Sequence, residues 1–287
     1  MITTRTVKIS ALNIAMHQPH SSKKYVELFK DAKKLNQLVR LGSLHGAILG
    51  SISPPKDGNS SSVLTGEIYR FVKLDPNEPW FNVETSDVAS DDEVRRISIP
   101  SHLLPHLQRI EFVFKPAVHE LWFISQDRKD RMGPQAAAKF FQYLFDSLVV
   151  AGRYPEIEVT VLPDAETLDQ MLSMSTLEKI TIELKRPNAD DASSEEAKWL
   201  KRLEKQGVRK QTTELVAAKG SFITPDKETQ TLAAVASRNG NVSIVGRDAT
   251  GLRVEESTQE RPLVMTALVD SEIETSMDVL RRTALSQ

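Results

Sequence analysis

The order of strand and helix patterns between residues 108 and 186 constrains the fold more than any other feature of the sequence. Residues 108–116 alternate apolar and polar side chains, and 118–125 form a second apolar strand pattern. Residues 134–150 then place apolar side chains at helical spacing. A strand, a helix and a strand follow over 156–186. This β-β-α-β-α-β order predicts an α+β fold, with an antiparallel or mixed sheet packed with helices.

The N-terminal part of the sequence predicts three more strands, at 5–16, 44–52 and 63–73, and a helix at 22–39. After the third strand, every charged residue between 74 and 94 is acidic. Prolines and serines interrupt this segment. We therefore expect a long, solvated acidic connection at 74–94 rather than part of the core.

A polar turn and a stretch rich in basic residues follow Pro187. The chain has 287 residues, a length that suits two domains. We expect an α+β domain at 1–187 and a second region, at 188–287, that contains a dimer contact. The second region begins with a basic helix at 195–209, continues as mixed helix and loop over 211–236, and then forms a β-hairpin. A last strand precedes a final helix, whose apolar stripe predicts a homodimer contact. The stripe consists of Ile273, Met277, Leu280 and Ala284.

Composition excludes several classes of protein. The chain contains no cysteine, which excludes disulfides, thiolate metal sites and cysteine nucleophiles, and fits a reducing compartment. The N-terminus has no apolar run that would form a signal peptide, and no uncharged apolar stretch is long enough to span a membrane. We therefore expect a cytoplasmic protein without a membrane partner. The formal net charge of −2 argues against a protein that is basic over its whole surface.

Segregated positive charge is the most informative functional signal. Residues 198–210 contain six basic residues and one acid, Glu204. On a helix most of these cations share one face, where like charges repel unless anions such as nucleic-acid phosphates neutralise them. A solvated helix face supported by Glu195 and Glu196 is the alternative. The predicted nucleic-acid-binding residues are Lys185, Arg186, Lys198, Lys201, Arg202, Lys205, Arg209, Lys210, Arg247 and Arg253.

A second pattern resembles the active site of metal-dependent endonucleases. Pro163-Asp164 followed by Glu183-Leu184-Lys185 matches a PD…(D/E)xK spacing, in which two carboxylates hold Mg²⁺ and a lysine orients water. Glu183 and Lys185 project from one face of the strand predicted at 178–186. Asp164, however, lies where a helix N-cap is expected, which already explains that residue.

No other constellation in the sequence predicts catalysis. His102 and His106 are separated by a proline and lack a carboxylate that would complete a ligand set, and His119-Glu120 lacks the second histidine of a zincin. There is no glycine-rich phosphate loop, dinucleotide fingerprint or nucleophile elbow. We therefore expect a protein without catalytic residues, metal or cofactor, except for Mg²⁺ under the nuclease hypothesis.

The C-terminal third resembles the Rex-type phage-exclusion proteins and, more closely, an uncharacterised bacterial family that is distantly similar to them. The resemblance lies in the strand LEKITIELKRPN at 177–188, the basic connection after it, and the hairpin VSIVGRDATGLRVEES at 242–257. It implies a homodimer that binds duplex DNA without sequence preference in phage exclusion or host defence. The acidic segment 74–94 would then have to point away from the DNA.

Three functional hypotheses follow from the sequence. The favoured one is a sequence-nonspecific nucleic-acid-binding protein whose partner is duplex DNA. The second is a metal-dependent nuclease that uses Asp164, Glu183 and Lys185. The third is a protein–protein interaction module that binds no nucleic acid.

Overall fold

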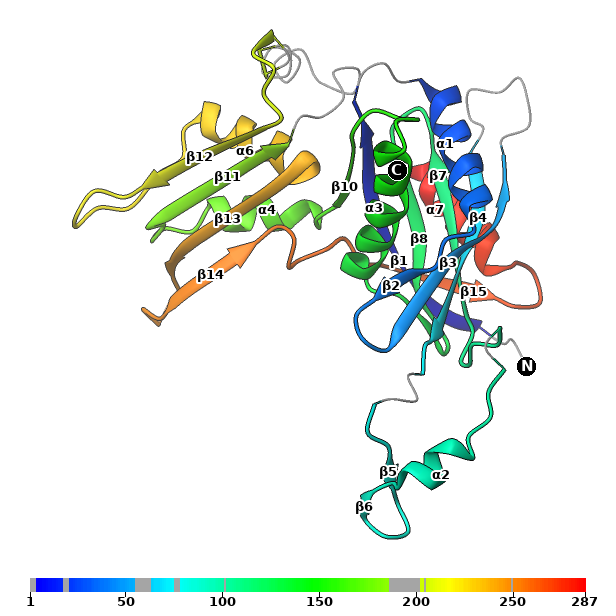
Figure 1. Ribbon diagram of the computed structural model, residues 1–287. Helices are drawn as coiled ribbons and strands as arrows, with labels where there is room; N and C mark the ends of the chain where they lie inside the picture. The colour runs from blue at the N-terminus through cyan, green and yellow to red at the C-terminus, as the bar shows by residue number, and fades with distance from the viewer. Residues whose placement is uncertain are drawn as a thin grey trace.

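The fold belongs to the α+β class, as the sequence predicts. The computed structural model describes residues 4–17, 21–54, 63–74, 78–100, 102–185, 202–203, 205–248 and 250–287. In this part of the chain six helices and fifteen strands are found, and all strand pairs between named strands are antiparallel. The strands form two larger sheets and one small hairpin (Figure 1).

The larger sheet has nine strands, and β1 lies near one end of it, between β8 and the two short strands β10 and β15. Along one edge β1 pairs with β8, whereas its other edge is shared by β15 over Thr4–Ile9 and by β10 over Leu12–Met16. The β9 strand extends the sheet beside β8. The strands are β10 (Ile157–Val161), β1 (Thr4–Met16), β8 (Glu120–Asp127), β7 (Gln108–Lys115), β4 (Leu64–Val72), β3 (His45–Ser53), β2 (Val39–Leu41), β15 (Met265–Asp270) and β9 (Asp130–Arg131).

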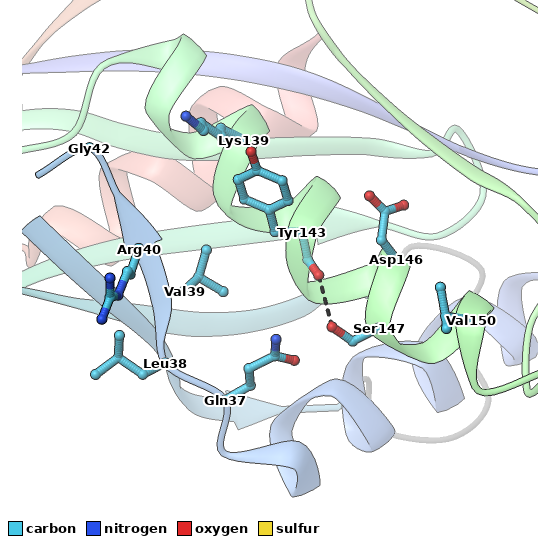
Figure 2. A pocket seen from close by; sticks show the side chains of 10 residues that line it. All are labelled: Gln37, Leu38, Val39, Arg40, Gly42, Lys139, Tyr143, Asp146, Ser147 and Val150. Atoms are coloured by element: carbon cyan, nitrogen blue, oxygen red, sulfur yellow. Dashed lines mark hydrogen bonds between the residues drawn. The ribbon is translucent and has the colours of Figure 1, made fainter.

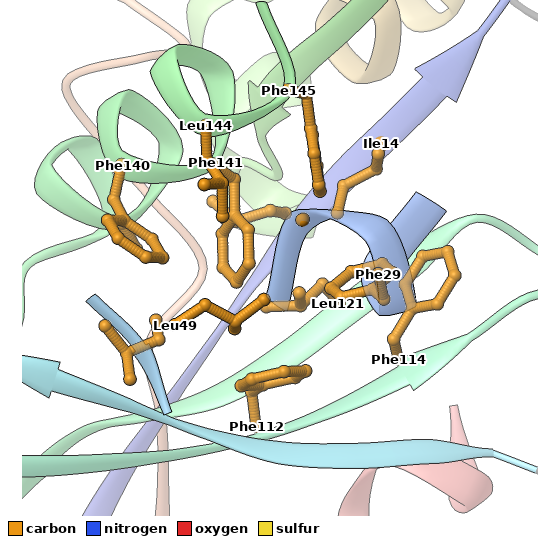
Figure 3. Close-up of a cluster of buried hydrophobic side chains, with 14 of the residues drawn as sticks. Ile14, Phe29, Leu49, Phe112, Phe114, Leu121, Phe140, Phe141, Leu144 and Phe145 are labelled. Atoms are coloured by element: carbon orange, nitrogen blue, oxygen red, sulfur yellow. The ribbon is translucent and has the colours of Figure 1, made fainter. Parts of the chain in front are cut away.

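Helices α1 (Ser22–Leu35) and α3 (Pro134–Val150) cover one face of this sheet. Their aromatic side chains point into a core shared with the strands (Figure 3). The Phe29 ring lies 4.8 Å from that of Phe114 and meets Phe145 edge-on at 5.5 Å between centroids. Such aromatic pairs add stabilisation beyond the apolar area that they bury. The regular apolar spacing of 134–150 therefore serves to bury one broad helical face.

Helix α7 (Ser276–Ser286) covers the opposite face of the same sheet. Leu280 and Ala284 are fully buried there, and Met277 packs against the same cluster, which includes Val7 and Trp122. The chain's own sheet therefore covers three residues of the apolar stripe that predicts a dimer contact, Met277, Leu280 and Ala284, whereas Ile273 lies before α7 and is exposed.

The second sheet is inserted between β10 and β15. Its four strands lie in the order β12 (Lys210–Val216), β11 (Lys179–Lys185), β13 (Gly240–Arg247) and β14 (Arg253–Ser257). Helices α4 (Ala165–Leu172) and α6 (Lys227–Asn239) pack on one of its faces. The chain leaves the large sheet at Pro163 and returns at Pro262, and these two prolines form an antiparallel bridge.

The segments that form the two sheets do not separate at residue 187, where we expected a domain boundary. Strand β11 precedes that boundary but pairs with β12 and β13, which follow it. Conversely, β15 and α7 lie after the boundary but pack with the N-terminal sheet. Residues 163–262 thus form a module that is inserted into the larger unit.

Three element boundaries differ from the sequence pattern. Helix α1 ends at Leu35, because Asn36 adopts a left-handed conformation (φ 45°), and Val39 already belongs to β2. The basic helix does not extend to residue 209, since Gly207 has φ +64° and the Val208 amide bonds back to the Leu203 carbonyl. A strand, β12, occupies part of the stretch expected to be mixed helix and loop.

The acidic connection forms an arm that projects away from the large sheet (Figure 1). It contains the two-stranded hairpin of β5 (Phe81–Asn82) and β6 (Asp87–Val88), followed by the short helix α2 (Asp91–Arg95). Helix α2 has no buried residue. Among the described residues, no helix combines the length and apolar character needed to cross a membrane.

Replacing Leu280 by alanine should lower the free energy of unfolding by roughly 2–5 kcal/mol, because Leu280 is 0% exposed and the deletion leaves a cavity beneath α7. Leu285→Ala on the same helix is the matched control, since that side chain is 51% exposed. Urea denaturation followed by circular dichroism measures both. Equal, small effects of the two substitutions would contradict the packing of α7 on the sheet.

Candidate nucleic-acid interface

Among the described residues, the face of the four-stranded sheet opposite α4 and α6, the open face, is polar and carries no covering helix. Strand β11 alternates between buried residues facing the helices, such as Ile182, and half-buried residues on the other side, such as Glu183 and Lys185. This confirms the alternation expected from the sequence. The cross-strand register extends the open face over the neighbouring strands. Its residues are Lys179, Thr181, Glu183, Lys185, Lys210, Thr212, Glu214, Val216, Asn241, Ser243, Val245, Arg247, Arg253, Glu255 and Ser257.

Two pairs of like-charged residues lie directly opposite one another on this face. Lys185 faces Lys210 across β11 and β12, and Arg247 faces Arg253 across β13 and β14. Directly opposed like charges destabilise an antiparallel pair unless counter-charges offset the repulsion. The sheet therefore carries a concentration of positive charge at two places, and each place requires nearby anions.

Acidic residues of the large sheet neutralise one end of this face. The Glu158 carboxylate on β10 lies 2.7 Å from the Lys185 ammonium and 3.6 Å from the Arg209 guanidinium. Arg209 also contacts Glu156 at 2.6 Å. The Glu158 side chain is only 10% exposed, so these contacts are partly shielded from water. Two of the predicted nucleic-acid-binding residues, Lys185 and Arg209, thus join the inserted module to the large sheet.

Helix α6 contributes a further connection at the same junction. Arg238 near its end forms an ion pair with Glu120 at 2.9 Å, and the Asn13 side-chain amide donates to the Arg238 carbonyl at 3.2 Å. The Gln135 side chain donates a hydrogen bond to the Gln259 carbonyl on the returning chain. In each ion pair between the two sheets, the acid belongs to the large sheet and the cation to the inserted module.

The remaining cations of the open face have partners within the module. Lys210 pairs with Glu183 at 2.9 Å, and Arg247 pairs with Glu178 at 2.8 Å. Arg253 is exposed and forms no ion pair with any described residue. Of the two opposed guanidiniums, therefore, only that of Arg247 has a carboxylate partner among the described residues.

The turn between β13 and β14 fixes the position of these two arginines. The Asp248 carboxylate accepts hydrogen bonds from the Thr250 hydroxyl at 2.6 Å, the Thr250 amide at 2.8 Å and the Leu252 amide at 3.0 Å. The Thr250 hydroxyl bond holds the pKa of Asp248 below its ordinary value. The Arg247 guanidinium also donates to the Gly251 carbonyl at 3.1 Å, which orients it along the hairpin.

The basic segment before β12 is described only in part. Arg202 and Lys205 are exposed on a short helical turn, while Leu203 packs into the core of the module. Lys210 belongs to β12, so neither it nor Arg209 shares a helical face with the others. Three predicted residues, Arg186, Lys198 and Lys201, lie outside the described residues.

The residues of the nuclease hypothesis do not assemble into a metal site. Asp164 is the N-cap of α4, which packs on the covered face of the sheet, whereas Glu183 and Lys185 lie on the open face. Glu183 pairs with Lys210, and Lys185 pairs with Glu158. Within the described ranges, no group of three or more His, Asp or Glu side chains is arranged to hold a metal ion.

Lys179 is a cation of the open face that the sequence analysis did not single out. It lies opposite Val216 and forms an ion pair with Glu214 at 2.7 Å. The alternation of 179–185 already places it on the same face as Glu183 and Lys185. The signal was therefore present, but only the packing of α4 and α6 shows that, in the part of the chain described, the helices cover the other face.

The two sheets, the inserted module and its open polar face define an α+β protein with a candidate surface for polyanions. Residues 5–285 match the family model described as "Domain of unknown function (DUF4747)", and the chain belongs to that family. A search of curated proteins found no match to the chain.

A double-mutant cycle tests the junction between the sheets. Glu158→Gln and Lys185→Met should show a coupling of roughly 0.5–3 kcal/mol in the free energy of unfolding, because the two side chains are in direct contact. The exposed pair Asp92 and Arg95 on the arm provides the control cycle, in which we expect coupling near zero. Additive effects of the first two substitutions would show that this ion pair does not join the modules.

Proposed function

We propose that this protein binds nucleic acid without sequence preference, through the open face of the inserted four-stranded sheet. The observation that carries the proposal is the direct opposition of Arg247 and Arg253, of which Arg247 pairs with Glu178 and Arg253 forms no ion pair with any described residue. Phosphate groups supply the anions that such a surface needs, and arginine binds them in a bidentate manner. Duplex DNA is the proposed partner.

The chemistry of the open face supports binding without sequence preference. The described residues of that face include hydroxyl, amide and charged side chains but no aromatic ring. Single-strand and RNA binders that read bases through a sheet stack them on aromatic side chains. Contacts to phosphates position a protein on a duplex but carry no sequence information.

The sheet register sets the length of duplex that the surface requires. Lys179 pairs with Val245, so Arg247 lies beyond the start of β11, at the end of the sheet opposite Lys185. The two opposed cation pairs are therefore separated by about eight residues along the strands, or roughly 26 Å. Phosphates of one DNA strand repeat about every 3.4 Å along the helix axis, so the span corresponds to about eight base pairs.

Bound phosphates have to compete with the acids that already pair with these cations. Lys179, Lys210 and Arg247 each have a carboxylate partner within the module. Binding therefore exchanges protein ion pairs for phosphate contacts, which favours a modest affinity. We place the dissociation constant for duplex DNA on the order of 10⁻⁴–10⁻⁶ M at physiological salt, typical of nonspecific binding.

The sequence resemblance adds a biological setting to the proposal. The segments 177–188 and 242–257, which resemble Rex-type phage-exclusion proteins, contain β11, β13 and β14. These strands contribute most of the open face. We accordingly place the protein in the cytoplasm, in phage exclusion or host defence.

Salt-dependent binding to a duplex tests the proposed function. Contacts through Lys179, Lys210, Arg247 and Arg253 should give a slope of about −3 to −4 in log K against log salt concentration. Replacing Arg247 and Arg253 together by glutamate should reduce the slope by about 2 and weaken binding, because two phosphate contacts are lost. Fluorescence anisotropy with labelled duplexes of unrelated sequence measures both quantities.

Removing a carboxylate that competes with DNA phosphates for a cation should strengthen binding. Glu183→Gln frees Lys210 and should strengthen binding. Glu274→Gln, just before α7, frees Arg282 on that helix and serves as the matched control, which should leave binding unchanged. Duplexes shorter than about eight base pairs should bind more weakly than longer ones. Salt-independent affinity, or an Arg247/Arg253 reversal that leaves binding intact, would refute the proposed function.

A further inference from the structure

The projecting arm, residues 73–107, is not required by the sheet that it interrupts. Strands β4 and β7, which flank it, are hydrogen-bonded neighbours in antiparallel register, with Arg70 opposite Gln108. Such neighbours can be joined by a turn of about two to five residues. A connection much longer than this, with structure of its own, is typical of a functional segment.

The base of the arm is fixed to the large sheet. The Arg70 guanidinium donates to the Gln108 side chain at 2.7 Å and to the Arg131 carbonyl at 3.1 Å. The Val72 amide donates to the Pro105 carbonyl at 3.0 Å. Within the arm, Asn82 donates to Glu93 at 2.6 Å, and Glu93 also accepts from the Ser90 amide at 2.8 Å in a capping box. Polar contacts thus shape the arm and set where it leaves the sheet.

The arm has no apolar core of its own. Phe81 is 66% exposed, Val83 80% and Val88 65%, and all three lie on or beside the β5–β6 hairpin. An isolated two-stranded hairpin is at best marginally stable in water. Apolar side chains gathered on such a projection are typical of a recognition surface, because they become buried only when a partner covers them.

The arm is also strongly acidic. Between residues 78 and 96 it carries six acidic residues and two basic ones, Arg95 and Arg96, and Arg95 pairs with Asp92. Three of the acids, Asp91, Asp92 and Glu93, lie in the first turn of α2. A partner surface for this arm should therefore combine apolar side chains with positive charge.

The groove between β2 and α3 has both properties (Figure 2). It is a shallow groove of about 820 Å³ on the outer side of α3, next to the edge strand β2. Leu38, Tyr143 and Val150 contribute exposed apolar surface. Arg40 and Lys139 contribute two positive charges against one negative charge from Asp146, and the Lys139 ammonium lies 5.6 Å from the centre of the Tyr143 ring.

We propose that the arm docks into the β2–α3 groove of a second copy of this chain, in a reciprocal dimer. Phe81, Val83 and Val88 bury their side chains against the apolar wall of the groove, and the acids of α2 face Arg40 and Lys139. A twofold axis makes each copy donate one arm and receive one, which closes the assembly at two subunits. This interface differs from the α7 stripe, which the large sheet covers.

Sedimentation equilibrium of the full-length chain over a range of concentrations tests the dimer. The wild type should dimerise, and a triple substitution of Phe81, Val83 and Val88 by serine should raise the dimer dissociation constant roughly tenfold or more. Ile273→Ser is the matched control, since this residue is 82% exposed outside the arm, and it should leave the dissociation constant unchanged. Thermal unfolding of each variant verifies that the fold is retained.

Charge-reversal variants of the groove, and mixtures of arm and groove variants, test whether the groove is the docking site. Arg40→Glu with Lys139→Glu should also weaken the dimer, and adding Asp91→Lys with Asp92→Lys in the same chain should restore it. An equimolar mixture of the arm variant and the groove variant should dimerise better than either alone, because one arm and one groove remain intact in the mixed pair.

Three results would overturn the proposal. The first is a wild-type chain that stays monomeric at the highest attainable concentration. The second is an arm variant that dimerises as well as the wild type. The third is a groove variant with unchanged dimerisation, which would show that the arm docks on another surface.

Discussion

The pairing of β1 on both of its edges is the constraint on which the rest of the structure depends. This strand is buried against α1 and α3 on one face and against α7 on the other. One edge of it is completed by two short strands in tandem, β10 and β15, which are far apart in the sequence. Because the backbone groups of a buried strand have to be hydrogen-bonded, the pairing of β15 brings the C-terminal part of the chain back to β1. Everything between Pro163 and Pro262 is therefore displaced into a separate module that begins and ends at one point.

Ion pairs position this module and determine which of its cations are already paired with acids. Its cations at the junction meet acids of the large sheet, and Glu158 alone serves both Lys185 and Arg209. These contacts position the module and, at the same time, remove two cations from the surface that could bind a polyanion. The positive charge that remains lies at the far end of the sheet, on Arg247 and Arg253. The proposed binding surface is therefore smaller than the count of basic residues suggests, and its affinity is set by competition with carboxylates.

Local patterns predicted most elements of the fold. Alternation over 179–185 assigned Glu183 and Lys185 to one face, and helical spacing over 134–150 assigned the buried face of α3, because both depend only on side-chain periodicity. The α1 and basic-helix boundaries were wrong where single residues, Asn36 and Gly207, adopt left-handed conformations that end the helix. The candidate site was predicted less well. Proximity to Glu158 depends on where β10 lies relative to β11, and no local pattern contains that information.

The sequence by itself determined the α+β class, the order of the elements and the acidic character of the arm, since each follows from periodicity or composition within a short window. The tertiary structure decided which cations are paired, which sheet face stays open and which apolar stripe is covered. Leu280 illustrates the difference: its helical spacing predicts an apolar face, but only the packing of α7 against the large sheet shows what covers that face. Strand pairing over long sequence separations is set by the cooperative burial of the whole core, so it cannot be deduced from any one segment.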